Sequence, residues 1–86
     1  MAYKIEFAAS AKKQFDKLPQ PVQARISKVI DRLSETPRPS GVVKLSGEKS
    51  LYRVRTGNHR VVYHIKDERL LVLVLKIGHR RDIYKQ

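Results

Sequence analysis

The chain has 86 residues, enough for a modest hydrophobic core, so we expect a single domain over residues 1–86. It has no cysteine, which excludes disulfides and thiolate metal sites, and its longest apolar run, Leu70–Leu75, is too short to cross a bilayer. Nineteen Lys and Arg against eight Asp and Glu give a net charge of +11. The opening MAYKIEF lacks the apolar region of a signal peptide, so we expect a cytoplasmic protein with no membrane partner. The charge favours a polyanionic ligand, although solubility or an acidic protein partner would also account for it.

The first half of the chain predicts one strand and then a hairpin of two helices. Apolar and polar residues alternate over residues 3–7, as in a half-buried strand. Ser10 can cap a short helix, which the LPQP segment at 18–21 interrupts. Pro21 then suits the first turn of a second helix, and the TPRPSG segment at 36–41 stops it. The apolar stripe of this second helix consists of Val22, Ile26, Val29, Ile30 and Leu33.

From Leu51 onward the pattern predicts three strands in an antiparallel meander. Apolar and basic residues alternate on both sides of the TGN turn at 56–58, which gives a hairpin. Residues 66–69 form a second tight connection, and Leu70–Ile77 is apolar almost throughout, as in a central strand covered on both faces. The order of one strand, two helices and three strands predicts a small α+β domain whose helices pack on one face of the sheet.

The alternation in the predicted hairpin separates apolar from cationic side chains. Because successive side chains of a strand point to opposite faces, we expect the apolar set to face the helices and the cationic set to face away. The apolar set is Tyr52, Val54, Val61, Tyr63 and Ile65, and the cationic set is Arg53, Arg55, Arg60 and His64. The turn brings Arg55 and Arg60 close together, which is repulsive unless something anionic binds there.

The residues available for chemistry argue against several common kinds of site. His59 and His64 point to opposite faces of one strand, so we expect no metal site, and nothing indicates another cofactor. Paired carboxylates, a nucleophile elbow and a phosphate-binding glycine loop are also missing. What remains is arginines, a histidine and a tyrosine, which can bind phosphate, stabilise phosphoryl transition-state charge and stack on a base. These groups suit binding RNA, or cleaving it without a metal.

The second half of the chain carries the motifs YR-x-R, R-x-x-Y and GHRR-x-x-Y, within LYRVRTGNHRVVYHI at 51–65 and KIGHRRDIY at 76–84. The opening MAYKIEFAASAKKQFDKLP, the helix end SETPRP and the loop KLSG at 44–47 add to this pattern. Together these segments resemble the toxins of the RelE/ParE superfamily, and the RelE branch in particular. The resemblance covers nearly the whole chain and implies a RelE-like fold.

The resemblance implies a toxin of a type II toxin–antitoxin module that acts as a ribosome-dependent endoribonuclease, or mRNA interferase. Such a toxin enters the A site of the small (30S) ribosomal subunit and cuts the mRNA there, which inhibits translation. The mRNA 2′-hydroxyl attacks the adjacent phosphate and leaves a 2′,3′-cyclic phosphate and a 5′-hydroxyl, with no metal. A cognate antitoxin wraps the toxin and blocks its basic face.

By position, the resemblance gives three arginines a catalytic role. Arg53 and Arg55 stand where the best-known branch has two lysines, which contact phosphate and help to activate the 2′-oxygen. Arg60 matches the arginine that stabilises the developing phosphorane charge. Because the pKa of arginine exceeds about 12, neither Arg53 nor Arg55 suits the role of general base. We therefore expect these two side chains to activate the 2′-oxygen electrostatically.

The segment that follows the last strand supplies the rest of the implied site. Arg80 matches the arginine that protonates or stabilises the leaving 5′-oxygen, and Tyr84 matches the tyrosine that stacks on or orients the base. His79 is expected to act as an acid or base, because an imidazole titrates near about pH 6.5. Further RNA contacts are expected from three cations, Arg81, Lys49 and Lys44.

Two other functions remain open from the sequence. A ParE-like toxin has the same fold but poisons gyrase and cleaves no RNA, and its members typically lack this basic set with its closing tyrosine. A non-catalytic RNA- or ribosome-binding module would use the same face purely as an electrostatic platform. At the level of single residues, Arg53 and Arg55 can be solvated strand residues, and Tyr84 can simply pack the end of the chain.

Overall fold

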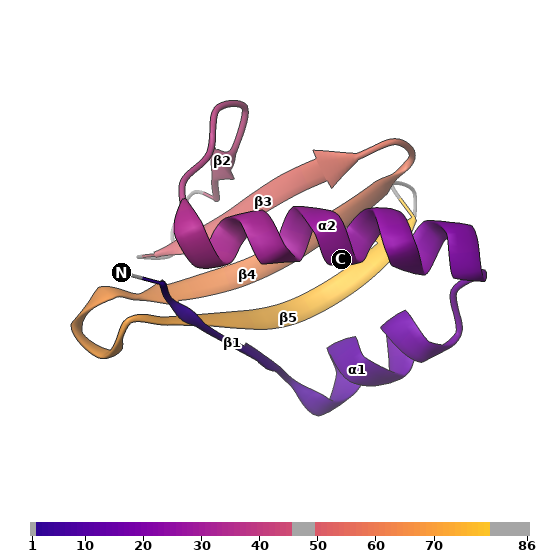
Figure 1. Ribbon diagram of the computed structural model, residues 1–86, viewed down its shortest axis with the longest axis horizontal. Coiled ribbons are helices and arrows are strands. Elements are labelled where there is room, and N and C mark those ends of the chain that lie inside the picture. The colour runs from indigo at the N-terminus through magenta and orange to yellow at the C-terminus, as the bar shows by residue number, and fades with distance from the viewer. Residues whose placement is uncertain (1, 46–49, 80–86) are drawn as a thin grey trace.

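A computed structural model describes residues 2–45 and 50–79 of the chain (Figure 1). This part of the sequence forms one strand, two helices and then four strands, and the five strands form one sheet in the order β1-β5-β4-β3-β2. The elements are β1 (Lys4–Phe7), α1 (Ala9–Asp16), α2 (Gln20–Glu35), β2 (Val43–Lys44), β3 (Leu51–Thr56), β4 (His59–Lys66), the 3₁₀ turn η1 (Asp67–Arg69) and β5 (Leu71–His79). The predicted α+β class is confirmed.

The sheet extends beyond the predicted meander at both of its edges. β3, β4 and β5 pair antiparallel as expected, and β1 joins them by pairing parallel with β5. At the other edge, Val43 and Lys44 form the short strand β2 opposite Arg53 and Tyr52, where the sequence predicted a loop beginning at Lys44. Two paired residues are too few to produce a period that a sequence pattern can reveal.

The helix hairpin follows the predicted pattern except at its first cap. α1 begins at Ala9 after an extended Ala8, and no side chain caps it, so the prediction that Ser10 is the cap was wrong. The Ser10 hydroxyl instead donates to the carbonyl oxygen of Leu75 at 3.4 Å, which ties α1 to the sheet. Pro21 does lie in the first turn of α2. Neither helix of the described residues has the length and apolar character needed to cross a membrane.

The core lies between the helices and one face of the sheet, and in Figure 1 α2 crosses in front of the strands. Its buried members come from both helices and from β3, β4 and β5. They are Ala11, Ile26, Ile30, Leu33, Tyr52, Val61, Tyr63, Ile65, Val72, Val74 and Ile77. The predicted apolar face of the hairpin is therefore confirmed, with Val54 half-buried against this core.

The prediction that β5 is covered on both faces was wrong for the part of the chain described. Val72, Val74 and Ile77 face the helices, whereas Leu73 and Leu75 are only half-buried on the opposite face, which we call the outer face. A bulge contributes to this pattern. Val62 pairs with Lys76 but Tyr63 pairs with Val74, so Leu75 is an extra residue in β5.

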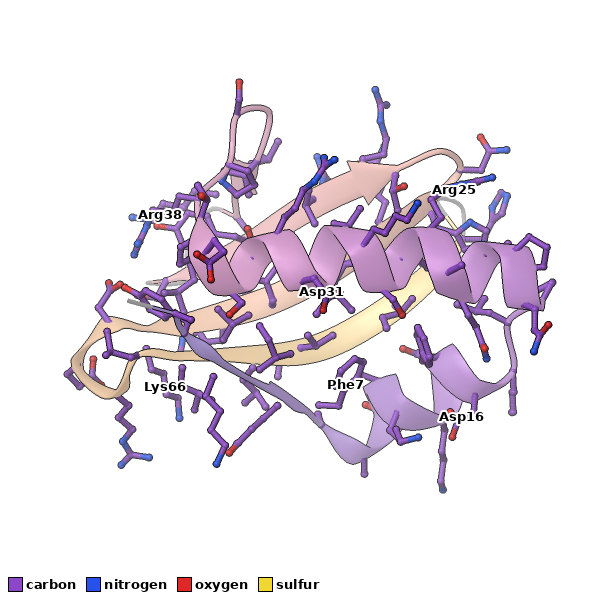
Figure 2. The ribbon with its side chains drawn as sticks, in the orientation of Figure 1. Phe7, Asp16, Arg25, Asp31, Arg38 and Lys66 are labelled. Atoms are coloured by element: carbon purple, nitrogen blue, oxygen red, sulfur yellow. The ribbon has the colours of Figure 1, made fainter. Side chains whose placement is uncertain are left out.

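A polar network joins four segments at one end of the sheet. Arg38, just past α2 (Figure 2), donates two hydrogen bonds to the carboxylate of Asp67, of 2.8 and 3.2 Å. Its Nε also donates to the hydroxyl of Tyr52 at 3.0 Å, and the hydroxyl of Tyr3 donates to Asp67 at 2.6 Å. Hydrogen bonds from Arg38 and Tyr3 hold the pKa of Asp67 below its usual value. The network anchors the segment between α2 and β2.

We expect Asp67→Asn to destabilise the protein near neutral pH and much less in acid. Because the pKa of Asp67 is lower in the folded than in the unfolded state, its carboxylate stabilises the fold above the unfolded value of about 3.9. That contribution is lost as the pH falls through the folded value. Urea unfolding of the wild type and of Asp67→Asn, at about pH 7 and about pH 3, measures this contribution to stability. Glu68→Gln is the control. An equal loss at both values would contradict a role for the charge.

Candidate functional site

Three arginines gather on the outer face of the sheet, as the alternation in the hairpin predicts. A cavity of about 280 Å³ there is lined by Gly41, Val43, Arg53, Arg55 and Arg60, and we call it the arginine cavity. Arg53 and Arg55 are two residues apart in β3, and Arg60 in β4 pairs directly with Arg55. Strand geometry therefore places all three side chains on the same face.

Arg60 is the most constrained of the three arginines. It is 4 % exposed and is the buried charged residue of the described part, whereas Arg53 is half-buried and Arg55 is exposed. Its partner across the ladder in β5 is Gly78, whose missing side chain leaves room for the arginine. The Nε–H of Arg60 is buried with no hydrogen-bond acceptor among residues 2–45 and 50–79, although the residue has other interactions. Packing thus holds this guanidinium in a defined place.

The segment between α2 and β2 forms the remaining wall of the arginine cavity. Gly41 has a φ of 89°, which residues with a side chain rarely adopt, and this turn leads into β2. Val43 lies directly opposite Arg53. The hydroxyl of Tyr63, a core residue, donates to the carbonyl oxygen of Pro37 at 2.7 Å. This bond attaches the start of the segment between α2 and β2 to the core. Neither Gly41 nor Val43 was predicted, because a loop residue carries no periodic signal.

The chemistry of the arginine cavity is that of an anion site. Arginine forks match the oxygens of a phosphate group, and partial burial strengthens such contacts because water screens them less. A charge that develops on a bound phosphoryl group would face three cations, of which Arg60 is held in place by burial. Among residues 2–45 and 50–79, no three His, Asp or Glu side chains are grouped so that they could hold a metal ion.

Two other predicted site residues lie away from the arginine cavity. Lys44 pairs with Tyr52, whose side chain faces the core, so Lys44 lies on the helix side of the sheet. His79 pairs with His59, and their ring centroids are 5.6 Å apart. Because the neighbouring pair of Arg60 and Gly78 faces outward, the histidine pair faces the helix side. The structure does not bring His79 together with the three arginines.

The other predicted cations and the closing tyrosine cannot be located relative to the arginine cavity. Four residues, Lys49, Arg80, Arg81 and Tyr84, lie outside the described residues. His64 does face outward as predicted. It lines a second cavity of about 280 Å³ further along the outer face, together with Leu51, Lys66, Leu73 and Leu75.

Comparison with known proteins gives consistent matches over nearly the whole chain. The family described as "ParE toxin of type II toxin-antitoxin system, parDE" matches residues 5–84. Toxin RelG of Mycobacterium tuberculosis is 30% identical over 87 residues, which cover 100% of both chains. The mRNA interferase toxin RelE of Escherichia coli K12 is 31% identical over 90 residues, covering 100% of this chain and 94% of the relative. A chain of the intact E. coli RelBE toxin–antitoxin complex, 31% identical, superposes with a TM-score of 0.81 over 91% of this chain and 96% of that chain.

Proposed function

This chain belongs to the RelE/ParE superfamily of toxins from type II toxin–antitoxin systems, and from that premise we propose that it is an endoribonuclease that cleaves mRNA on the ribosome. The observation that carries the proposal is the arginine cavity, which gathers Arg53, Arg55 and Arg60 on one face. A similar protein, from E. coli, is named an mRNA interferase. Because translating ribosomes are cytoplasmic, we expect the protein to act in the cytoplasm and to inhibit translation.

In the proposed reaction the scissile phosphate binds in the arginine cavity. Arg53 and Arg55 bind its oxygens, and their positive charge favours transfer of the 2′-hydroxyl proton to water. The 2′-oxygen then bonds to phosphorus, the bond from phosphorus to the 5′-oxygen breaks, and the 5′-oxygen takes a proton from water. Arg60 stabilises the extra negative charge that the phosphorane carries. By resemblance, we propose that Arg80 acts at the leaving oxygen and that Tyr84 stacks on the base.

Primer extension on a defined mRNA, with and without translating ribosomes, tests this function. We expect cuts inside codons that require the ribosome, and fragments that end in a 2′,3′-cyclic phosphate and a 5′-hydroxyl. Ribosome binding without any cut would favour a non-catalytic binding module instead. Gyrase-linked DNA breaks without mRNA cleavage would favour a gyrase poison of the ParE kind.

We expect ribosome binding to weaken steeply as salt is added, because each phosphate contact releases counterions. With ribosomes that carry a non-cleavable 2′-deoxy mRNA, the logarithm of the affinity should fall linearly with the logarithm of the salt concentration. Arg55→Ala should reduce that slope by about 0.7, the value for one phosphate of a single strand. The exposed Arg69 in η1 gives the control, Arg69→Ala. A slope that Arg55→Ala leaves unchanged would contradict a phosphate contact in the arginine cavity.

We also propose a cognate antitoxin as the protein partner. The similar E. coli chain was solved in a toxin–antitoxin complex. A protein that covers the arginine cavity has to neutralise three cations, so we expect it to present acidic side chains there. Such a partner would exclude the mRNA phosphate from the cavity.

A further inference from the structure

A second basic cluster lies at the tip of the β3–β4 hairpin, on the helix side of the sheet. It consists of Arg25 in α2, His59 at the start of β4 and His79 at the end of β5. The two imidazoles meet edge to face, with ring centroids 5.6 Å apart. Figure 2 shows Arg25 beside the turn between β3 and β4, and its Nη1 lies 3.1 Å from the position that a Cβ on Gly57 would occupy.

The other two members of this cluster, His79 and Arg25, disfavour the charged form of His59. Burial lowers the pKa of His59, and so do the nearby charges of His79 from β5 and Arg25 from α2. These two residues are the charged groups that affect His59 in the described part of the chain. Such an arrangement opposes protonation of His59 in the free protein. An anion that binds among the three side chains would reverse this effect by stabilising their charged forms.

The position of the cluster relates it to the arginine cavity. His59 directly precedes Arg60 in β4, and Gly78 directly precedes His79 in β5. Neighbouring pairs of the same ladder therefore point to opposite faces, with one pair at each basic site. The Gly57 turn, with a φ of 60° and no side chain, is the edge between the two sites. A strand of RNA that rounds the hairpin tip would meet both.

We propose that Arg25, His59 and His79 form a second phosphate-binding site, which holds a phosphate of the RNA chain next to the one in the arginine cavity. The inference rests on the proposed function for its ligand, an RNA strand. It assigns to His79 a binding role on the helix side in place of the acid or base role implied by resemblance. Because imidazole binds phosphate best when protonated, this contact should strengthen as the pH falls.

NMR titration of the imidazoles in the full chain tests this site without any cleavage. The probe is a short RNA with non-cleavable 2′-deoxy linkages, and inorganic phosphate is a second probe. We expect the probe to raise the pKa of both His59 and His79. For each unit by which one pKa rises, the probe should bind the protein with that histidine protonated about tenfold more tightly than the protein with it neutral. Unchanged histidine titrations under saturating probe would overturn the proposal.

Arg25→Gln provides the decisive variant, because Arg25 is exposed on α2, and thermal melts show whether the variant still folds. It should weaken probe binding about tenfold, as loss of a hydrogen bond to a charged group predicts, so about tenfold more probe should be needed to raise both histidine pKa values. Arg32→Gln, exposed further along α2, should change neither. An affinity for the probe that Arg25→Gln leaves unchanged would overturn the proposal.

The two proposals fail in different ways. If wild-type protein cleaves mRNA on the ribosome but its histidines do not respond to the probe, the second phosphate site is wrong and the proposed function stands. If the histidines respond as expected but no mRNA is cut, the second site stands as an RNA contact and the nuclease function is wrong.

Discussion

We expect Arg60→Ala to cleave ribosome-bound mRNA about 100- to 1,000-fold more slowly than the wild type, the usual cost of removing one fixed donor to a developing oxyanion. Arg60 is 4 % exposed, and Gly78 across the ladder leaves its side chain room. A guanidinium held in this way needs no reorganisation when charge develops on the phosphorane. The loss should therefore appear in the single-turnover cleavage rate and much less in ribosome affinity.

Two further variants separate the geometry of Arg60 from its charge and from folding. Arg60→Lys keeps the charge but lacks the planar fork, so we expect a rate between those of the alanine variant and the wild type. Arg69→Ala, an exposed arginine in η1, should cleave at the wild-type rate. Thermal melts of each variant show whether the buried site still folds. A folded Arg60→Ala protein that cleaves at the wild-type rate would refute the assigned role.

The grouping of the three arginines on one face was predictable because it depends on a local period. In β3 and β4, every second residue faces the core, and the residues between them include Arg53, Arg55 and Arg60. The same reasoning does not place His79. Val72, Val74 and Ile77 are all core residues, although Val74 and Ile77 are an odd number of positions apart, because the bulge at Leu75 shifts the alternation of β5. His79 shares the face of Ile77, so its orientation toward the helix side depends on that bulge.

Other features depend on contacts between distant parts of the chain, which no local period reports. The hydrogen bond between Arg38 and Asp67 joins a loop to a turn. From the sequence alone, each of these residues is expected to be a solvent-exposed charge. Arg25 meets the turn at Gly57 only because α2 crosses the hairpin tip. The extra residue at Leu75 likewise follows from pairing with β4. The long apolar run of β5 therefore predicted burial on both faces, whereas only the face toward the helices is fully buried.

The cluster of cations has a consequence for the stability of the free protein. Arg55 and Arg60 face each other across β3 and β4, and the net charge is +11, so the folded state carries internal repulsion. A ligand that neutralises the arginine cavity stabilises the fold by mass action. The hydrophobic core between the helices and the sheet has to offset this repulsion when no ligand is present.

We expect Ile30→Ala to lower the free energy of unfolding by about 2–5 kcal/mol, through lost burial and the cavity left behind. Ile30 is 4 % exposed, in the middle of α2, and belongs to the core shared with β3, β4 and β5. For a domain of this size the loss corresponds to a Tm lower by about 10 °C or more. Lys28→Ala, exposed on the same helix, should change stability by less than about 0.5 kcal/mol. Equal melting of the two variants would mean that α2 does not cover the sheet through Ile30, and the core that positions the hairpin would have to be reassigned.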